Sequence, residues 1–209
     1  MDTSDDSATH ASRDVSGSGI PTRESTHGSQ SVGATTFRSG KSARAEARGS
    51  QERVEAIRRV LEAVTDPEIP VINVLEMGMI ADVRIEQNRV VIDMTPTFAG
   101  CPALDMIREN IRTAVTGLGE TDVTVNVVYD PPWTTDRISD EGRRKLKEFG
   151  LAPPGKRCSA TETPDLEKIA CPHCDSTNTE LESIFGATLC RSIHYCHHCL
   201  QSFEHFKVV

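Results

Sequence analysis

Hydrophobic residues recur with helical spacing in two stretches of the chain. The sequence ERVEAIRRVLEAV and the sequence after GCP each carry one apolar stripe, which predicts an amphipathic helix packed on a core. The stripes comprise Val54, Ile57, Val60, Leu61 and Val64 in the first stretch, and Leu104, Ile107, Ile111 and Val115 in the second. The prolines of TDPEIP end the first predicted helix, and GLGE ends the second.

Between these two helices, hydrophobic and polar residues alternate with the period of a strand. Residues 79–85 and 90–94 form two alternating runs, and the Gln-Asn pair between them predicts a hairpin turn. A third run, DVTVNVVYD, follows the second helix, and DEGRRKLKEFG predicts a final helix with Gly150 just past its end. The order helix, strand, strand, helix, strand, helix predicts an α+β fold for residues 51–150, a small two-layer α/β sandwich.

The segments on either side of residues 51–150 have a different composition. Residues 1–50 are rich in Ser, Thr, Gly and charge and hold only one Phe, one Ile and two Val, which predicts a disordered tail. Residues 151–168 hold three prolines and Cys158, and they are predicted to form a linker or an extended strap. In residues 169–209, TELESI and TLCRSIHY flank a turn at FGA, and SFEHFKVV can add a third strand.

Five of the seven cysteines lie in this C-terminal segment. Cys171 and Cys174 form one Cys-x-x-Cys pair, and Cys196 and Cys199 form another. Two such turns supply the four soft ligands of a tetrahedral Zn or Fe site, so residues 169–209 are predicted to be a β-rich zinc ribbon. Two disulfides in a secreted domain are the alternative reading of the same spacing.

Cys190 lies outside the two pairs. Packing in the hairpin is the commoner fate of a lone cysteine. A fifth thiol ligand near the metal is the alternative.

Charge and composition narrow the class of protein. The net charge is −8, which argues against a nucleic-acid binder, because phosphate contacts need clustered Lys and Arg. The polar start, MDTSDDSATHASRDVSGSG, resembles neither a signal nor a transit peptide, and no apolar run reaches the length of a membrane span. With an odd number of cysteines in metal-type spacing, these features predict a cytoplasmic protein.

Two short motifs in residues 51–150 carry candidate chemistry. TDPEIP places Asp66 and Glu68 around a proline, and TPTFAGCPA places Cys101 just before a helix. Amide N–H groups and the helix dipole at such a terminus favour a thiolate, so Cys101 is a candidate nucleophile, sulfur carrier or soft-metal ligand. The plainer readings are a packed or capping cysteine and acidic residues that decorate a loop.

These motifs resemble the family that includes SufT and the cytosolic iron–sulfur assembly proteins. That family is marked by a DPE-type loop and a cysteine in a T-x-T-x-x-G-C-P context. PPWTTDRISDEGRRKL, followed by GLAPP, and the C-terminal CPHC…FGATLCRSIHYCHHC…FEHFK further resemble the PaaD (PaaJ) family of phenylacetyl-CoA 1,2-epoxidase subunits. The matching positions are Asp66, Pro67, Glu68, Thr95, Thr97, Gly100, Cys101 and Pro102.

The resemblance covers residues 51–209 and implies a sandwich of the iron–sulfur assembly type followed by the ribbon. It implies that the partners are the di-iron oxygenase and the reductase of the epoxidase, which carry out the oxidation. This chain has no Glu-x-x-His pair on long helices, and it lacks the G-x-G-x-x-G loop and the C-x₄-C-x₂-C run that those subunits need. The implied role is therefore an accessory one: maturing or maintaining metal centres, with a transient Fe or Fe–S species at Cys101 and help from Asp66 and Glu68.

Three other roles fit the same residues. The chain could be a general iron–sulfur assembly factor, or a structural adaptor that docks through the ribbon and the loop of Trp133 without handling metal. A thiol-dependent enzyme that uses Cys101 is the weakest of the three, because residues 51–150 contain no histidine to act as its base.

Overall fold

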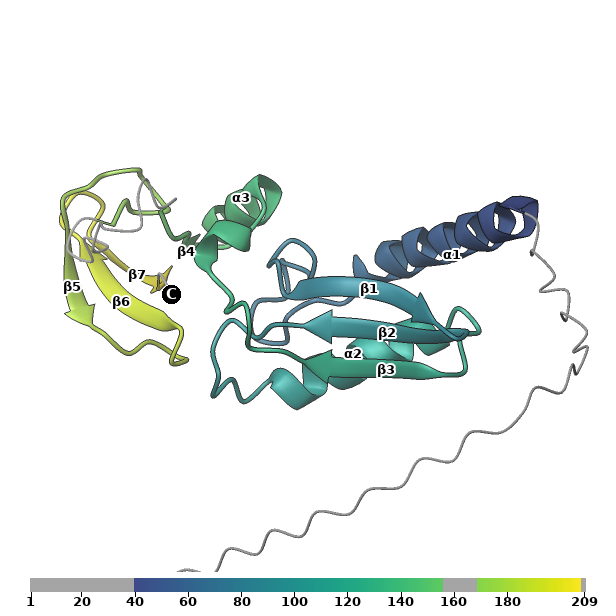
Figure 1. The fold of residues 1–209 in the computed structure, drawn as a ribbon. Coiled ribbons are helices and arrows are strands. Elements are labelled where there is room, and N and C mark those ends of the chain that lie inside the picture. The colour runs from purple at the N-terminus through teal and green to yellow at the C-terminus, as the bar shows by residue number, and fades with distance from the viewer. Residues whose placement is uncertain (1–39, 156–168, 208–209) are drawn as a thin grey trace, which may run out of the picture. The chain divides into compact units, whose positions relative to one another are not determined.

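A three-stranded sheet organises the first part of the chain in the computed structural model, which describes residues 40–155 and 169–207. Strands β1 (Ile80–Glu86), β2 (Arg89–Met94) and β3 (Val123–Val127) lie in the order β1-β2-β3 (Figure 1). β1 pairs with β2 in antiparallel fashion and β2 pairs with β3 in parallel fashion. All described residues belong to one unit of the chain, residues 38–209.

The predicted hairpin between β1 and β2 is confirmed. Gln87 and Asn88 both have positive φ, 49° and 72°, as the two central residues of a type I′ turn require. This turn matches the twist of the flanking strands, so it fixes the register in which Glu86 pairs with Arg89.

Two helices cover one face of this sheet, as the two-layer sandwich predicts. α1 (Gly40–Leu61) contacts β1, α2 (Leu104–Thr116) contacts β3, and the two helices contact each other. α2 is also the crossover that the parallel β2–β3 pair needs. The buried side chains of this layer comprise Ile57, Leu61, Val90, Ile92, Met94, Ile107, Ile111 and Val115.

The helix α1 begins at Gly40, inside the segment that the sequence predicts to be disordered. The prediction followed the apolar stripe, which starts at Val54. Ala, Arg, Lys and Glu in the preceding residues are good helix formers, so the helix extends toward the N-terminus without an apolar face.

The segment after β3 folds back toward the start of the sheet. The indole of Trp133 is buried at 3% exposure, and its Nε1 donates to the carbonyl of Met77 (2.9 Å). Trp133 is therefore a core residue, and the expectation that its loop offers a docking surface is not supported by this side chain. A short 3₁₀ turn (Thr135–Arg137) then leads into α3 (Asp140–Glu148), which Ser139 caps and Gly150 follows with a φ of +89°.

The C-terminal residues form a second, four-stranded sheet. β5 (Thr179–Ser183), β6 (Arg191–Cys196) and β7 (Gln201–Phe206) are antiparallel neighbours, as the sequence predicts. β4 (Leu151–Ala152) adds a parallel edge strand beside β7, so the sheet has the order β4-β7-β6-β5. The predicted linker therefore starts with two residues of regular strand, and Cys158 lies outside the described residues.

No helix in the described part of the chain is both long and apolar enough to cross a membrane.

Candidate functional site: a four-cysteine centre and a thiol-carboxylate group

The two Cys-x-x-Cys turns bring four sulfurs to one point in the second sheet. The Sγ atoms of Cys171, Cys174, Cys196 and Cys199 all lie within 4.8 Å of one another. The Cys171–Cys199 and Cys174–Cys196 pairs are each 3.6 Å apart. Four sulfurs bound at about 2.3 Å around a tetrahedral metal lie about 3.8 Å apart, so the group fits a Zn or Fe ion. All four are free thiols, which contradicts the disulfide alternative.

The backbone around this centre favours the thiolate form that binds a metal. The N–H groups of Cys199 and His198 donate to the sulfur of Cys196 and lower the pKa of this thiol to about 6. Burial and the neighbouring sulfurs raise the pKa of Cys199 to about 12. A bound cation reverses the second effect, because it compensates the charge of the four sulfurs.

Cys190 is not part of the four-cysteine centre. Its sulfur lies 3.0 Å from the hydroxyl of Thr188, and the side chain packs against the core of the first sheet. Of the two readings of Cys190, packing is the one that the structure shows.

Cys101 lies in the tight turn that connects β2 to α2. Its N–H donates to the carbonyl of Phe98 (3.1 Å), and its own carbonyl accepts from the N–H of Leu104 (3.3 Å). The helix starts at Leu104, because Pro102 and Ala103 still belong to the turn.

The thiol of Cys101 is half-buried, and its pKa differs from the sequence prediction. The N–H of Ala103 lowers the pKa, as expected near a helix terminus, but the larger effect of burial raises it. The charges of Asp66, Cys190 and Glu68 raise it further. The prediction of a lowered pKa is therefore wrong: removal from water and nearby negative charge outweigh one amide donor.

The side chain of Asp66 shapes its own loop. Its Oδ1 accepts from the N–H groups of Glu68 (2.7 Å) and Ile69 (3.1 Å), which closes an Asx turn across Pro67. The backbone N–H of Asp66 donates to the carbonyl of Ile72 (3.1 Å), which joins the two ends of the loop. The carboxylates of the DPE motif are thus held on a rigid loop.

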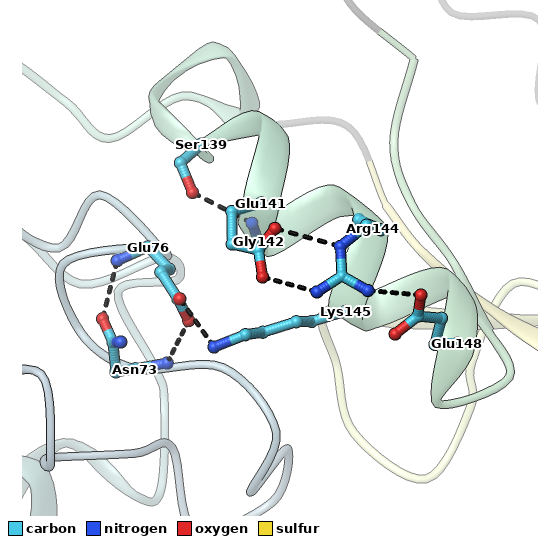
Figure 2. A network of polar contacts seen from close by, with 8 residues as sticks. All are labelled: Asn73, Glu76, Ser139, Glu141, Gly142, Arg144, Lys145 and Glu148. Atoms are coloured by element: carbon cyan, nitrogen blue, oxygen red, sulfur yellow. Dashed lines mark hydrogen bonds and ion pairs between the residues drawn. The ribbon is translucent and has the colours of Figure 1, made fainter.

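A polar network braces the end of this loop against α3 (Figure 2). Asn73 Oδ1 accepts from the N–H of Glu76 (2.9 Å), and Glu76 Oε2 accepts from the N–H of Asn73 (3.1 Å). Lys145 on α3 donates to the other oxygen of Glu76 (2.7 Å), and the N–H of Ser139 donates to the Glu76 carbonyl (2.9 Å). Glu76 and Lys145 are largely shielded from water, at 17% and 31% exposure, so this ion pair is stronger than a surface pair.

Arg191 connects the second sheet to the DPE loop. Its buried guanidinium donates to the carbonyl of Glu68 (2.9 Å) and to Oε2 of Glu204 (2.8 Å). Sequence reasoning missed this residue, since a contact between positions 68 and 191 leaves no local pattern. The charges of Asp66 and Glu68 act on the thiol of Cys101 and also on the thiol of Cys190, the neighbour of Arg191.

Comparison with known families matches both parts of the chain. Residues 54–127 match the family described as "Iron-sulfur cluster assembly protein", and residues 155–207 match the "PaaD zinc beta ribbon domain". The chain is 39% identical over 157 residues to a subunit of the "Putative 1,2-phenylacetyl-CoA epoxidase" of Escherichia coli, covering 75% of this chain and 93% of that protein. It is 37% identical to the "Fe-S protein maturation auxiliary factor YitW" of Bacillus subtilis, over 41% of this chain and 84% of that protein.

Solved structures are also similar to a part of the chain. A domain of unknown function (DUF59) from Bacillus anthracis is 32% identical, with a TM-score of 0.45, and covers 48% of this chain and 96% of that domain. A conserved hypothetical protein from Thermotoga maritima is 35% identical, with a TM-score of 0.39, over 44% of this chain and 91% of that protein.

Proposed function

Because the chain belongs to the PaaD family of phenylacetyl-CoA epoxidase subunits, we propose that it matures or maintains the iron or iron–sulfur centres of a phenylacetyl-CoA 1,2-epoxidase complex in the cytoplasm. It acts as an accessory subunit and not as the oxygenase. Its partners are the di-iron oxygenase and the reductase of that complex.

The observation that carries this proposal is the position of Cys101. A half-buried thiol in a tight turn lies within electrostatic reach of two carboxylates on a separately braced loop, Asp66 and Glu68. Burial raises the pKa of the thiol most, and the uncompensated charges of the two carboxylates raise it further. A ferrous ion removes the repulsion and makes the thiolate the stable form, so the arrangement favours holding iron over acting as a free nucleophile.

The four-cysteine centre has a different task in this proposal. Its sulfurs supply a closed tetrahedral set, which is typical of a structural Zn site and leaves no position open for exchange. The centre would hold the second sheet together, and the metal passed to the epoxidase would be handled at Cys101. Zn is the ion that we assign to it, with Fe as the alternative.

The test is the iron content of the epoxidase in cells that carry variants of this chain. Cys101→Ala, Asp66→Asn and Glu68→Gln are each expected to yield an epoxidase with less iron and a matching loss of phenylacetyl-CoA turnover. Asp66→Asn keeps the oxygen that closes the Asx turn, so a loss there reports the charge and not the loop. Asp105→Asn, at an exposed carboxylate in the first turn of α2, is the matched control.

The complex should still assemble in all of these variants, because Asp66→Asn and Glu68→Gln keep the size of the side chain and Cys101→Ala removes only one sulfur atom. Normal iron content and normal turnover in all three would refute the maturation role and leave a structural adaptor. A loss of activity in unrelated iron–sulfur enzymes of the same cells would instead favour the general assembly role of the SufT-like relatives.

A further inference from the structure

We propose that Arg191, on the second sheet, is a positioning residue for the DPE loop and that it acts by holding the backbone of Glu68 in place. The arginine works through Glu68 and is not itself a ligand. This inference rests on the proposed function, since it adds a positioning residue to the same metal-handling site. It gives the second sheet a task beyond the four-cysteine centre.

The first observation is that both peptide groups of Glu68 are held. Its N–H donates to Oδ1 of Asp66 (2.7 Å), within the loop itself. Its carbonyl accepts from Nη2 of Arg191 (2.9 Å), which lies 123 positions later in the chain. In the described part of the chain, the carboxylate of Glu68 has no hydrogen-bond or ion-pair partner. A fixed backbone under a free carboxylate suits a metal ligand, because the hydrogen bonds around a ligand decide where it points.

The second observation is that Arg191 is itself held firmly. Its guanidinium is only 7% exposed, and Nη1 donates to Oε2 of Glu204 (2.8 Å). The other oxygen of Glu204 accepts from the N–H of Ala187 (2.8 Å), so this carboxylate joins β7 to the turn before β6. The N–H of Gly186 in that turn donates to the carbonyl of Arg191 (2.9 Å). The arginine is thus fixed through both its side chain and its backbone.

The third observation is the position of Arg191 in its sheet. It pairs with Phe206 across β6 and β7, and the ring of Phe206 packs edge-to-face on Trp133 with the ring centroids 6.0 Å apart. The indole of Trp133 donates to the carbonyl of Met77 (2.9 Å), one residue after Glu76. The strand position that carries the guanidinium is therefore anchored to the first part of the chain by a second, independent contact.

The chemistry of the guanidinium explains why an arginine suits this position. It keeps its charge and presents five N–H donors in a planar fork, so it can hold a carboxylate and a carbonyl at the same time. Glu204 compensates the charge of Arg191. The bond to Glu68 goes to the neutral carbonyl, which leaves the carboxylate of this residue available to a metal ion.

The test compares Arg191→Met with the unchanged chain, both with Zn²⁺ bound at the ribbon. Methionine keeps a long apolar side chain and removes every donor. The NMR signal of the Glu68 carbonyl carbon, read through the amide of Ile69, should shift because its hydrogen bond is lost. Amide exchange in residues 66–72 should become about tenfold faster, the effect of losing one bond to a charged donor. Epoxidase iron in cells should fall as it does in Glu68→Gln.

Two further variants separate positioning from stability. When Arg191→Met is combined with Glu68→Gln, epoxidase iron should fall no further than in Glu68→Gln alone, because Arg191 acts through Glu68. A merely structural arginine would give losses that add. Arg191→Lys should restore part of the iron, since the ammonium can still donate to the carbonyl. Arg84→Met, at an arginine that pairs with carboxylates on the first sheet, is the matched control and should change neither the carbonyl signal nor the iron.

Glu204→Gln covers the case in which Arg191→Met fails to fold. Glutamine keeps the size of the side chain and one oxygen for the N–H of Ala187, and it removes the charged acceptor of Arg191. The Glu68 carbonyl signal and the epoxidase iron should change in the same direction as in Arg191→Met, by a smaller amount.

Three results would overturn the inference. One is an unchanged Glu68 carbonyl signal in Arg191→Met or, where this variant does not fold, in Glu204→Gln. Another is normal epoxidase iron in Arg191→Met, or additive iron losses in the combined variant. The third is loss of the ribbon zinc in Arg191→Met, which would make the arginine a part of the ribbon fold.

The failure of this inference and the failure of the proposed function give different results. With any of these three results, low epoxidase iron in Cys101→Ala would still support the proposed function. Normal iron in Cys101→Ala, Asp66→Asn and Glu68→Gln would refute that function whatever the carbonyl signal shows, and the positioning role would be refuted with it.

Discussion

At the scale of single residues, Gly78 has the most constrained position in the loop that precedes β1. Its φ is +69°, and a Cβ built on it would lie 2.3 Å from the carbonyl oxygen of Arg137. Gly119 also has a positive φ, +92°, but a Cβ there would meet nothing within 4 Å. Substitutions at the two glycines therefore distinguish backbone strain, which both share, from steric overlap, which only Gly78 would have.

Gly78→Ala should lower the free energy of unfolding by more than Gly119→Ala does. Strain at positive φ costs about 1–2 kcal/mol for a residue with a Cβ, and Gly119→Ala should show this cost alone. At Gly78 the overlap with backbone atoms adds to it, so a total loss above about 3 kcal/mol is expected. Urea titration of both variants measures the difference, and equal losses would contradict the overlap.

His205 should make the stability of the protein depend on pH. The ring is fully buried, and burial, followed by the nearby ring of His194, lowers its pKa to about 4. The neutral form is thus the folded form. The contribution of His205 to the free energy of unfolding is complete above the unfolded pKa of about 6.5. It is lost as the pH falls toward 4, by about 1.4 kcal/mol per pH unit.

Urea unfolding of the zinc-loaded chain between pH 7 and pH 5 measures this slope. His205→Gln should reduce this slope by the amount that one proton contributes. His198→Gln, at an exposed histidine, should leave it as in the unchanged chain. Identical slopes in all three proteins would show that His205 does not titrate on unfolding.

At the scale of elements, α3 is held on the first part of the chain by the network of Asn73, Glu76 and Lys145 (Figure 2). Asn73 Oδ1 accepts from two backbone N–H groups, those of Leu75 and Glu76, so it shapes the loop that presents Glu76 to the helix. The ion pairs that Arg144 makes with Glu141 and Glu148 lie on the outer side of α3 and are about half exposed.

Asn73→Ala should therefore destabilise the fold by about 1–3 kcal/mol, because it leaves two N–H groups without their acceptor. Arg144→Ala should cost no more than about 0.5–1 kcal/mol, since its pairs are exposed. Urea midpoints of the two variants give the comparison. A larger loss in Arg144→Ala would mean that the surface of α3, and not the loop, holds the helix.

The elements were predictable from sequence wherever the signal was local. Neighbouring residues determine the turn at Gln87 and Asn88 and the strands of the ribbon. They also determine the end of α3 before Gly150. The start of α1 was not predictable from hydrophobic spacing, because the apolar stripe in the sequence starts only at Val54. The sequence also did not show whether Trp133 faces the core or the solvent, since its hydrogen-bond partner Met77 lies 56 positions earlier.

At the scale of the whole molecule, the candidate site depends on contacts that no sequence window contains. The four ribbon ligands were predictable, because Cys-x-x-Cys spacing alone brings each pair together. The raised pKa of Cys101 was not, because it results from burial and from charges on the DPE loop and on the second sheet. Arg191, which joins the sheet to that loop, has no sequence signature at all.

Removal of the ribbon metal should increase the mobility of the DPE loop. The core of the ribbon consists of little more than Ala152, Phe203 and two of the cysteines, so its order depends on the ion. Without the ion, β6 loses its anchor and Arg191 can no longer hold the carbonyl of Glu68. Cys196→Ser, or a strong chelator, should release zinc, open the ribbon to protease and speed hydrogen exchange in residues 66–72.

Cys158→Ser is the control for the variant, because it removes a thiol that belongs to neither Cys-x-x-Cys pair. Exchange in α2 should change little, since that helix packs on the first sheet. Full metal content and unchanged proteolysis in Cys196→Ser would contradict the assignment of the four ligands. Unchanged exchange in residues 66–72 would show that the DPE loop does not depend on the ribbon.

The edge-to-face contact between Trp133 and Phe206 has a consequence for the synthesis of the chain. Phe206 is fully buried in the core of the first sheet, and its ring centroid lies 6.0 Å from that of Trp133. A ribosome makes the whole of that sheet long before it reaches residue 206. In the nascent chain, one side of the Trp133 ring therefore stays uncovered until β7 leaves the ribosome and Phe206 packs against it.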